Sequence, residues 1–175
     1  MRPQVTSLFS HPNRRILLGA IAALGIAGYV TVVRPRFAQK AEPQGYQVMA
    51  ADAAFEAAKT GDIILVDIRR PDEWQDTGIG EGAVALDMRE ESFVVSLVSL
   101  RESYPDTPIA LICRTGNRSG YVVNALVEQG FPDLVDVSEG MVGGRNGQGW
   151  IPRGLPVYAG TTAEITPRLE AVMTP

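Results

Sequence analysis

The sequence is short of the residues on which much hydrolytic and metal chemistry depends. Its 175 residues contain one cysteine, Cys113, and one histidine, His11. A single thiol cannot form an internal disulfide or supply a structural zinc site built from several thiolates. His11 lies near the N-terminus, so the rest of the chain has no histidine base for a Ser-His-Asp or Cys-His mechanism. Chemistry at Cys113 must therefore use groups other than histidine.

Positive charge is scarce beyond the first 41 residues. Six of the 16 lysines and arginines lie in residues 1–41, which contain no acidic residue. The other ten bases are outnumbered by 20 acids, so residues 42–175 carry a formal charge of −10. Nucleic-acid binding needs clustered cations, so we expect no nucleic-acid partner. The content of 45% hydrophobic and 21% charged residues is ordinary for a globular protein and excludes a disordered chain.

Charge is absent altogether from Ile16 to Val33, a run of 18 residues with arginines on either side. This length is sufficient for a membrane-spanning helix. A small-x-small cleavage site is missing around residues 38–41, which favours an uncleaved anchor, with a cleaved secreted form as the alternative. The sequence therefore predicts an N-terminal hydrophobic helix and linker over residues 1–41. We expect the body that follows to lie outside the cytoplasm, on the periplasmic side of the membrane.

The body alternates short apolar runs with helical patterns. Ile63–Val66 and Ile109–Ile112 are unbroken aliphatic runs, as expected of strands buried on both faces. Further strands are predicted at 46–49 and 134–137, and helices at 50–59, 91–101, 119–129 and 164–172. This order predicts an α/β fold with a small parallel sheet and helices on both faces. Ligands of such folds bind beyond the carboxyl ends of the strands, and Cys113 follows one of these ends.

The residues after the strand at 109–112 have the features of an anion-binding loop. Gly116 and Asn117 tolerate the positive φ angles that let a tight loop point several N–H groups inward. The N-terminus of the next helix, together with Arg114 and Arg118, adds positive charge near the sulfur. These effects favour the thiolate of Cys113, since a free cysteine titrates near ~8.5. We therefore predict that Cys113 is the nucleophile and that the loop binds the substrate through Arg114, Thr115, Gly116, Asn117 and Arg118.

A thiolate without histidine suits two classes of reaction. It can attack sulfur and form a persulfide, or it can attack phosphorus or arsenic, as in phosphatases and arsenate reductases. The phosphatase pattern places five residues between cysteine and arginine, whereas four residues separate Cys113 from Arg118. The tighter loop favours sulfur chemistry. The remaining alternative is a cysteine that serves only as a small buried hydrophobe, and a position at a strand end beside two arginines disfavours it.

Three separated motifs carry a resemblance to a known family. The first is CRTGNR at 113–118 with Ser119 after it, the second is LVDIR at 65–69 with Glu73 and Trp74, and the third is Trp150 with GLPV at 154–157. In this order the motifs resemble those of the rhodanese family, the single-domain thiosulfate-type sulfurtransferases. The resemblance implies a rhodanese-like domain over residues 42–160 and a C-terminal tail over 161–175.

The resemblance implies an activity that needs neither cofactor nor metal. Cys113 would attack the outer sulfur of an anionic donor such as thiosulfate, hold it as a persulfide, and pass it to cyanide or a thiol outside the chain. The alternative is a membrane-tethered module that binds a partner or presents sulfur without general turnover. A glycine-rich insert, GGRNGQG at Gly143–Gly149, is expected beside the cysteine loop. Either Arg145 or Asn146 faces the donor, or the insert is a solvated loop without a role.

The other charged and aromatic residues of the motifs are interpreted as structural. Arg69, Arg70, Asp72 and Glu73 form a mixed-charge cluster, which is typical of solvated faces or structural ion pairs. The two tryptophans, Trp74 and Trp150, are expected in the core. We assign none of these residues to catalysis.

Overall fold

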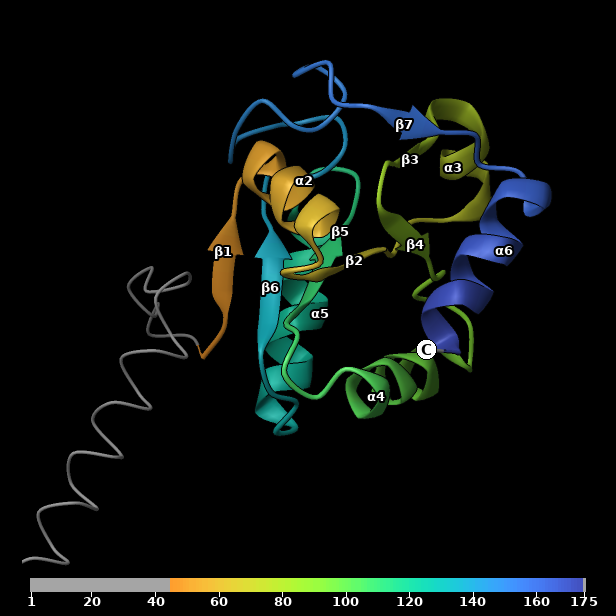
Figure 1. The fold of residues 1–175 in the computed structure, drawn as a ribbon. Helices are drawn as coiled ribbons and strands as arrows, with labels where there is room; N and C mark the ends of the chain where they lie inside the picture. The colour runs from red at the N-terminus through yellow and green to blue at the C-terminus, as the bar shows by residue number, and fades with distance from the viewer. Residues whose placement is uncertain (1–44, 175) are drawn as a thin grey trace, which may run out of the picture. The chain divides into compact units, whose positions relative to one another are not determined.

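A five-stranded parallel sheet is the centre of the fold in the computed structural model, which describes residues 45–174 (Figure 1). The strand order across the sheet is β1-β6-β5-β2-β4. Its strands are β1 (Gln47–Met49), β2 (Ile64–Asp67), β4 (Ala83–Ala85), β5 (Ile109–Ile112) and β6 (Leu134–Val137). The helices are α2 (Ala51–Thr60), α3 (Pro71–Thr77), α4 (Phe93–Ser103), α5 (Asn117–Glu128) and α6 (Thr162–Met173). Two short strands, β3 (Ile79–Gly80) and β7 (Val157–Tyr158), form a separate antiparallel pair.

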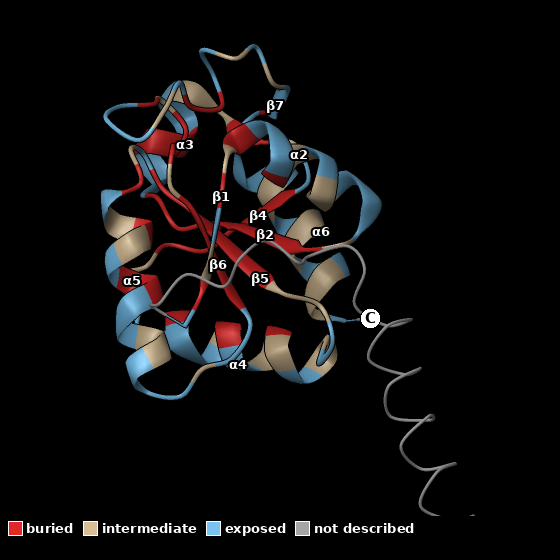
Figure 2. Ribbon diagram, turned by 90° about the vertical axis from the view of Figure 1, so that its left-hand side faces the viewer, coloured by how far each residue is buried: buried red, intermediate tan, exposed pale blue. Residues whose placement is uncertain are grey.

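The predicted α/β architecture with a parallel sheet is confirmed. Helix α2 lies on one face of the sheet and α5 on the other (Figures 1 and 2). Strands β5 and β6 have the predicted bounds, and β1, β2, α2, α4, α5 and α6 begin within two residues of the predicted positions. Elements α3, β3, β4 and β7 were not predicted, because each is short and none has a long apolar run.

The core is built on the two faces of the central strands. All four residues of β5 are fully buried (Figure 2). On one face, Val66 and Leu111 pack with Leu97 and Leu100 of α4 and Val123 of α5 in one hydrophobic cluster. Because side chains alternate along a strand, the intervening residues of β5 point to the opposite face, on which α2 lies. The sheet is thus covered on both faces, as its continuous apolar strands require.

The C-terminal segment is also helical and contacts the core. Helix α6 packs against β4 and α4. Its partly buried side chains Leu169, Val172 and Met173 lie against the hydrophobic cluster. The predicted terminal helix is therefore present and covers the edge of the sheet at β4.

The mixed-charge cluster contains structural ion pairs. Asp67 and Arg69 form a buried pair with 2.7 Å between Oδ2 and Nη2, and their side chains are 0% and 1% exposed. Arg69 also donates to the Gly78 carbonyl at 2.6 Å, and so joins the end of β2 to the end of α3. Trp74 and Trp150 are buried, as predicted.

The predicted membrane segment, residues 16–33, lies outside the described residues. The structure therefore does not test whether this segment is cleaved or how it is oriented. Within residues 45–174, no helix is long and apolar enough to cross a bilayer. The hydrophobic N-terminal helix therefore stays a prediction.

Candidate active site

Cys113 lies where the sequence placed it, directly after β5 and before α5. The chain turns at Gly116, which precedes the first residue of α5 and has a φ of 85°. The N-terminus of α5 is thus directed to the loop, where its free N–H groups and partial positive charge favour an anion. The strand, turn and helix follow one another as predicted at a carboxyl end of the sheet, and anion binding by this loop stays a prediction.

A second backbone segment, which follows β6, is held against the cysteine loop. The N–H of Met141 donates to the Cys113 carbonyl at 2.8 Å, and the N–H of Val142 donates to the Arg114 carbonyl at 2.9 Å. A Cβ on Gly140 would lie 2.6 Å from the Arg114 carbonyl oxygen. Glycine is therefore required at the point where the two backbones meet.

The sulfur of Cys113 is buried, with 0% of the residue exposed. Its hydrogen-bond partner is Ser119 of α5, whose Oγ lies 3.5 Å from Sγ and 3.2 Å from the Gly116 carbonyl oxygen. Its position at a strand end beside two arginines was expected to disfavour a buried cysteine, and the burial of Cys113 contradicts that expectation. Alternation along β5 places residue 113 on the same side as Ile109 and Leu111, in the hydrophobic cluster with Val122.

Arg118 is paired with an acid from another part of the chain. Its two terminal nitrogens donate to the two carboxylate oxygens of Glu73 at 2.7 and 2.6 Å. Burial raises the pKa of Glu73, but the Arg118 hydrogen bond and the Arg70 N–H outweigh it, so this pKa lies below its ordinary value. The hydrogen bond to Glu73 raises the pKa of Arg118 against the effect of burial, and the nearby Cys113 contributes to the rise.

The ion pair with Glu73 therefore limits how far Arg118 can bind the donor, as the sequence predicts it to do. Three of its five N–H groups remain for a ligand after the two bonds to Glu73. The Glu73 carboxylate also accepts the backbone N–H of Arg70 at 3.2 Å and so caps α3. Sequence reasoning took Glu73 as part of a structural cluster and missed its contact with the cysteine loop.

The other predicted loop residues differ in exposure. Arg114 and Asn117 are exposed, Thr115 is half-buried and Gly116 is buried. Arg114 has no acidic partner among residues 45–174. Its charge is therefore available to an incoming anion.

The glycine-rich insert lies beside the cysteine loop, as expected. Arg145 donates to the Asn117 side-chain oxygen at 3.3 Å, and Asn146 donates to the Ser138 carbonyl at 3.1 Å. A Cβ on Gly144 would lie 3.9 Å from the Cβ of Thr115. The contact of Arg145 or Asn146 with a donor stays a prediction.

The far end of this insert is fixed by Glu139, a residue that sequence reasoning did not single out. Its carboxylate accepts the N–H of Gly149 at 3.1 Å and two bonds from Arg153 at 2.9 and 2.6 Å. The Arg153 hydrogen bond holds the pKa of Glu139 below its ordinary value, with burial acting in the opposite direction. The insert is thus an ordered part of the site.

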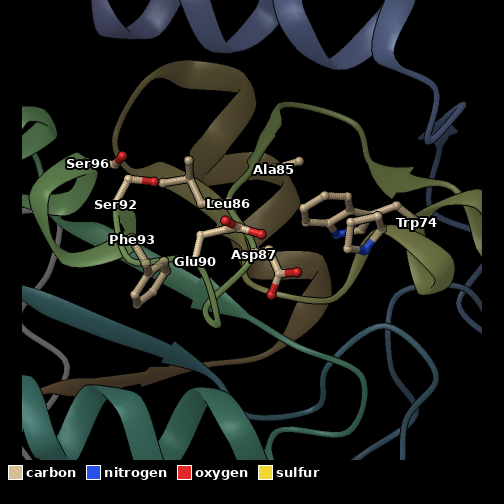
Figure 3. A pocket seen from close by; sticks show the side chains of 9 residues that line it. Trp74, Ala85, Leu86, Asp87, Glu90, Ser92, Phe93 and Ser96 are labelled. Atoms are coloured by element: carbon tan, nitrogen blue, oxygen red, sulfur yellow. The ribbon is translucent and has the colours of Figure 1, made fainter.

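A pocket of about 270 Å³ opens at the carboxyl end of β4 (Figure 3). Its apolar wall includes Trp74, Leu86 and Phe93, and its polar wall includes Asp87 and Glu90. Residues 113–118 do not line it. Asp87 is paired with Arg89, so Glu90 carries the uncompensated charge, and no cation lines the pocket to bind an anionic donor such as thiosulfate.

The chain matches the family model of the rhodanese-like domain over residues 50–146. It belongs to the rhodanese-like domain family, which confirms the resemblance stated from the sequence. The match covers the motifs at 65–74 and 113–119 and ends before the third motif, at 150–157. The match includes Cys113 and the whole of its loop.

Curated relatives are similar to this chain over about half of its length. A protein named sulfurtransferase from Allochromatium vinosum is 28% identical over 102 residues, which cover 58% of this chain and 84% of that protein. An uncharacterized protein from Rickettsia prowazekii (strain Madrid E) is 29% identical over 98 residues, covering 53% and 80%. The first of these relatives supports a sulfurtransferase family for this chain.

The fold is also similar to a solved structure. The polysulfide-sulfur transferase homodimer from Wolinella succinogenes has a TM-score of 0.50 and 20% identity, over 81% of this chain and 93% of that chain. This likeness shows the fold alone.

Proposed function

We propose that the protein is a sulfurtransferase that carries a sulfane sulfur on Cys113. The thiolate attacks the outer sulfur of a donor such as thiosulfate, a new S–S bond forms, and the S–S bond of the donor breaks. Sulfite leaves with the electron pair, so Cys–S⁻ and S–SO₃²⁻ become Cys–S–S⁻ and SO₃²⁻. A nucleophile such as cyanide or a thiol then takes the terminal sulfur and restores the thiolate.

The observation that supports this proposal is the contact of the Cys113 sulfur with the hydroxyl of Ser119, in the first turn of α5. Ser119 Oγ, 3.5 Å from Sγ, supplies a hydrogen bond to an anionic sulfur. The N-terminus of α5 and the charge of Arg118 suit an anionic donor and a persulfide anion at this position. This arrangement provides nucleophilic catalysis by an activated cysteine without a histidine base.

Burial of the sulfur sets a condition on the mechanism. A donor can reach the Cys113 sulfur only if the residues that cover it move aside, since Cys113 is 0% exposed. Arg114 and Asn117, both exposed, are placed to bind an anionic donor before it enters. Closure would then shield the persulfide from water and oxidants.

The acceptor must come from outside the chain, because Cys113 is the only thiol. The protein would therefore act as a relay between a donor and a separate acceptor. A module that presents sulfur to one protein partner, without general turnover, uses the same persulfide and remains the second candidate.

The test is the mass of the intact protein after incubation with thiosulfate. We expect an adduct of about 32 Da, one sulfur atom, that is lost on addition of cyanide with release of thiocyanate. The Cys113→Ser variant should fold and form no adduct, and Ser138→Ala serves as a control that keeps the thiol. An adduct on the Cys113→Ser protein would refute the assignment, and Cys113-dependent hydrolysis of p-nitrophenyl phosphate would favour phosphatase chemistry instead.

We also propose that residues 16–33 anchor the protein in a membrane with the rhodanese-like domain on the periplasmic side. The 18-residue uncharged run supports this proposal. The full chain should resist extraction from membranes by sodium carbonate, and protease added to spheroplasts should degrade the domain. Release by carbonate would contradict the anchor, and protection from protease would contradict the orientation.

A further inference from the structure

Two exposed arginines beside the cysteine loop lack an acidic partner. Residues 45–174 contain ten lysines and arginines, and seven of these form ion pairs with acids. An eighth, Arg101, donates instead to backbone carbonyls of residues 104–107 and 132–133. The other two, Arg114 and Arg145, are exposed and pair with no acid in this part of the chain. Both stay uncompensated although acids outnumber bases in the domain.

Arg145 lies in a two-residue hairpin turn. The N–H of Gly144 donates to the Gly147 carbonyl at 2.9 Å, and the N–H of Gly147 donates to the Gly144 carbonyl at 3.3 Å. Arg145 and Asn146 are therefore the two central residues of the turn. Asn146 also fastens the turn to the Ser138 carbonyl, to which its side chain donates at 3.1 Å. The position of Arg145 is thus determined by hydrogen bonds on both sides of it.

The turn brings Arg145 to the cysteine loop. Arg145 Nη2 donates to Asn117 Oδ1 at 3.3 Å, and Asn117 is the fourth residue after Cys113. The chain that leads into the turn is joined to the loop, because the Val142 N–H donates to the Arg114 carbonyl at 2.9 Å. The two unpaired arginines therefore belong to neighbouring segments at the same end of the sheet, and both are accessible to an incoming donor.

Most of the hydrogen-bonding capacity of Arg145 is unused. A guanidinium has five N–H donors, and one nitrogen of Arg145 is engaged by Asn117. Arginine binds a carboxylate through two parallel N–H···O bonds, which fix the orientation of the bound group. A carboxylate at the far end of a sulfur donor would compensate the charge of Arg145 while the other end of the donor reacts.

We propose that Arg145 is a specificity-determining residue that binds a second anionic group of the sulfur donor. The preferred donor is then an organic sulfane-sulfur compound with a carboxylate beyond its reacting sulfur. This inference rests on the proposed sulfur transfer and names the class of its donor.

Thiosulfonates are suitable members of this donor class. The Cys113 thiolate attacks the terminal sulfur of R–SO₂–S⁻, a new S–S bond forms, and the S–S bond of the donor breaks. Sulfinate leaves with the electron pair, so Cys–S⁻ and R–SO₂–S⁻ become Cys–S–S⁻ and R–SO₂⁻. Arg145 takes no part in these steps and binds only the carboxylate on R.

The test compares 4-carboxybenzenethiosulfonate with 4-carbamoylbenzenethiosulfonate, which differ in the charge of one group. The kcat/KM of each donor is measured on the full chain, with cyanide as acceptor and thiocyanate as product. The ratio of the two values, carboxylate over amide, should be about fivefold lower in Arg145→Gln than in the wild type, the upper range for one exposed ion pair. The fall should lie in the KM for the carboxylate. Comparing ratios cancels the intrinsic reactivity of the two donors.

Lys59→Gln is the matched control, because it also removes one exposed positive charge. Lys59 lies in the last turn of α2, and its side chain is 64% exposed. This variant should keep the wild-type ratio. If Arg145→Gln keeps the wild-type ratio, or if Lys59→Gln lowers it equally, the inference is overturned.

Failure of the proposed function is a different outcome. If neither thiosulfonate transfers sulfur to the wild-type protein, the sulfurtransferase assignment fails. Arg145 is then tested by calorimetric titration with 4-carboxybenzenesulfonate and 4-carbamoylbenzenesulfonate, which have no sulfur to transfer. A Kd ratio that favours the carboxylate in the wild type and falls about fivefold in Arg145→Gln would support the subsite. The same ratio in both proteins, or no binding of either anion, would refute it.

Discussion

Gly116 is the position at which the cysteine loop is most sensitive to substitution. Its φ of 85° is in the left-handed region, and an added Cβ would lie 1.8 Å from the Ser138 carbonyl oxygen. A left-handed conformation costs an ordinary residue about 1–2 kcal/mol, and forcing an extra carbon into packed structure costs roughly another 1–3 kcal/mol. Gly116→Ala should therefore lower the free energy of unfolding by about 2–5 kcal/mol. The same clash should push the loop away from Ser138 and reduce persulfide formation on Cys113.

The chain offers a matched control for the backbone part of this effect. Gly130 has a φ of 83°, but nothing lies within 4 Å of the Cβ position. Gly130→Ala should therefore lose only about 1–2 kcal/mol and keep full persulfide formation. Urea unfolding followed by the fluorescence of the buried Trp74 and Trp150 gives both free energies. Equal losses in the two variants, or a Gly116→Ala protein with wild-type persulfide formation, would refute the proposed contact between the loops.

Two other predictions concern the acids that hold the site. Glu73→Gln should lower the free energy of unfolding by about 1.5–3 kcal/mol, as expected for a charge-assisted pair. It should also lower the KM for thiosulfate, because Arg118 is released from the pair. The control Asp72→Asn removes an exposed pair and should change neither quantity. An unchanged KM would show that Arg118 does not meet the donor. Glu139 has a depressed pKa, so its stabilisation is present above its unfolded pKa and is lost as pH falls through the folded value. As pH falls from 5 to 3, Glu139→Gln should therefore lose less stability than the wild type. If the urea midpoints of the two proteins fall by the same amount over this range, the pairing with Arg153 does not stabilise the fold.

The central part of the fold could be predicted from sequence because its strands are buried on both faces. Strands β5 and β6 are unbroken or nearly unbroken apolar runs, and their bounds are those predicted. Helix α3 carries no apolar periodicity in its seven residues, and β4 is only three residues long. Such short elements are determined by tertiary contacts, for example by the Arg69 bond to the Gly78 carbonyl, and not by local pattern.

The cysteine loop could be predicted, but its partners could not. Glu73 lies 45 residues before Arg118 and meets it because β2 is next to β5 in the sheet. Residues 138–142 meet the loop because β6 lies on the other side of β5. This strand order is not contained in any local pattern. The burial of Cys113, in contrast, follows from simple alternation with Ile109 and Leu111 and could have been predicted.

The pairing of charges at the site limits which groups can recognise an anionic donor. Arg118 is bound to Glu73, Arg153 to Glu139 and Arg89 to Asp87, so each of these cations is largely compensated. What remains for an anion is the backbone N–H groups at the start of α5 and two exposed arginines, Arg114 and Arg145, that have no acidic partner among residues 45–174. Backbone donors have fixed geometry and cannot be neutralised by a neighbouring acid, so they hold a small anion or a persulfide in one orientation. Selectivity for the reacting sulfur group of a donor should therefore depend more on the shape of the loop, which Gly116 and Gly140 allow, than on the number of its arginines.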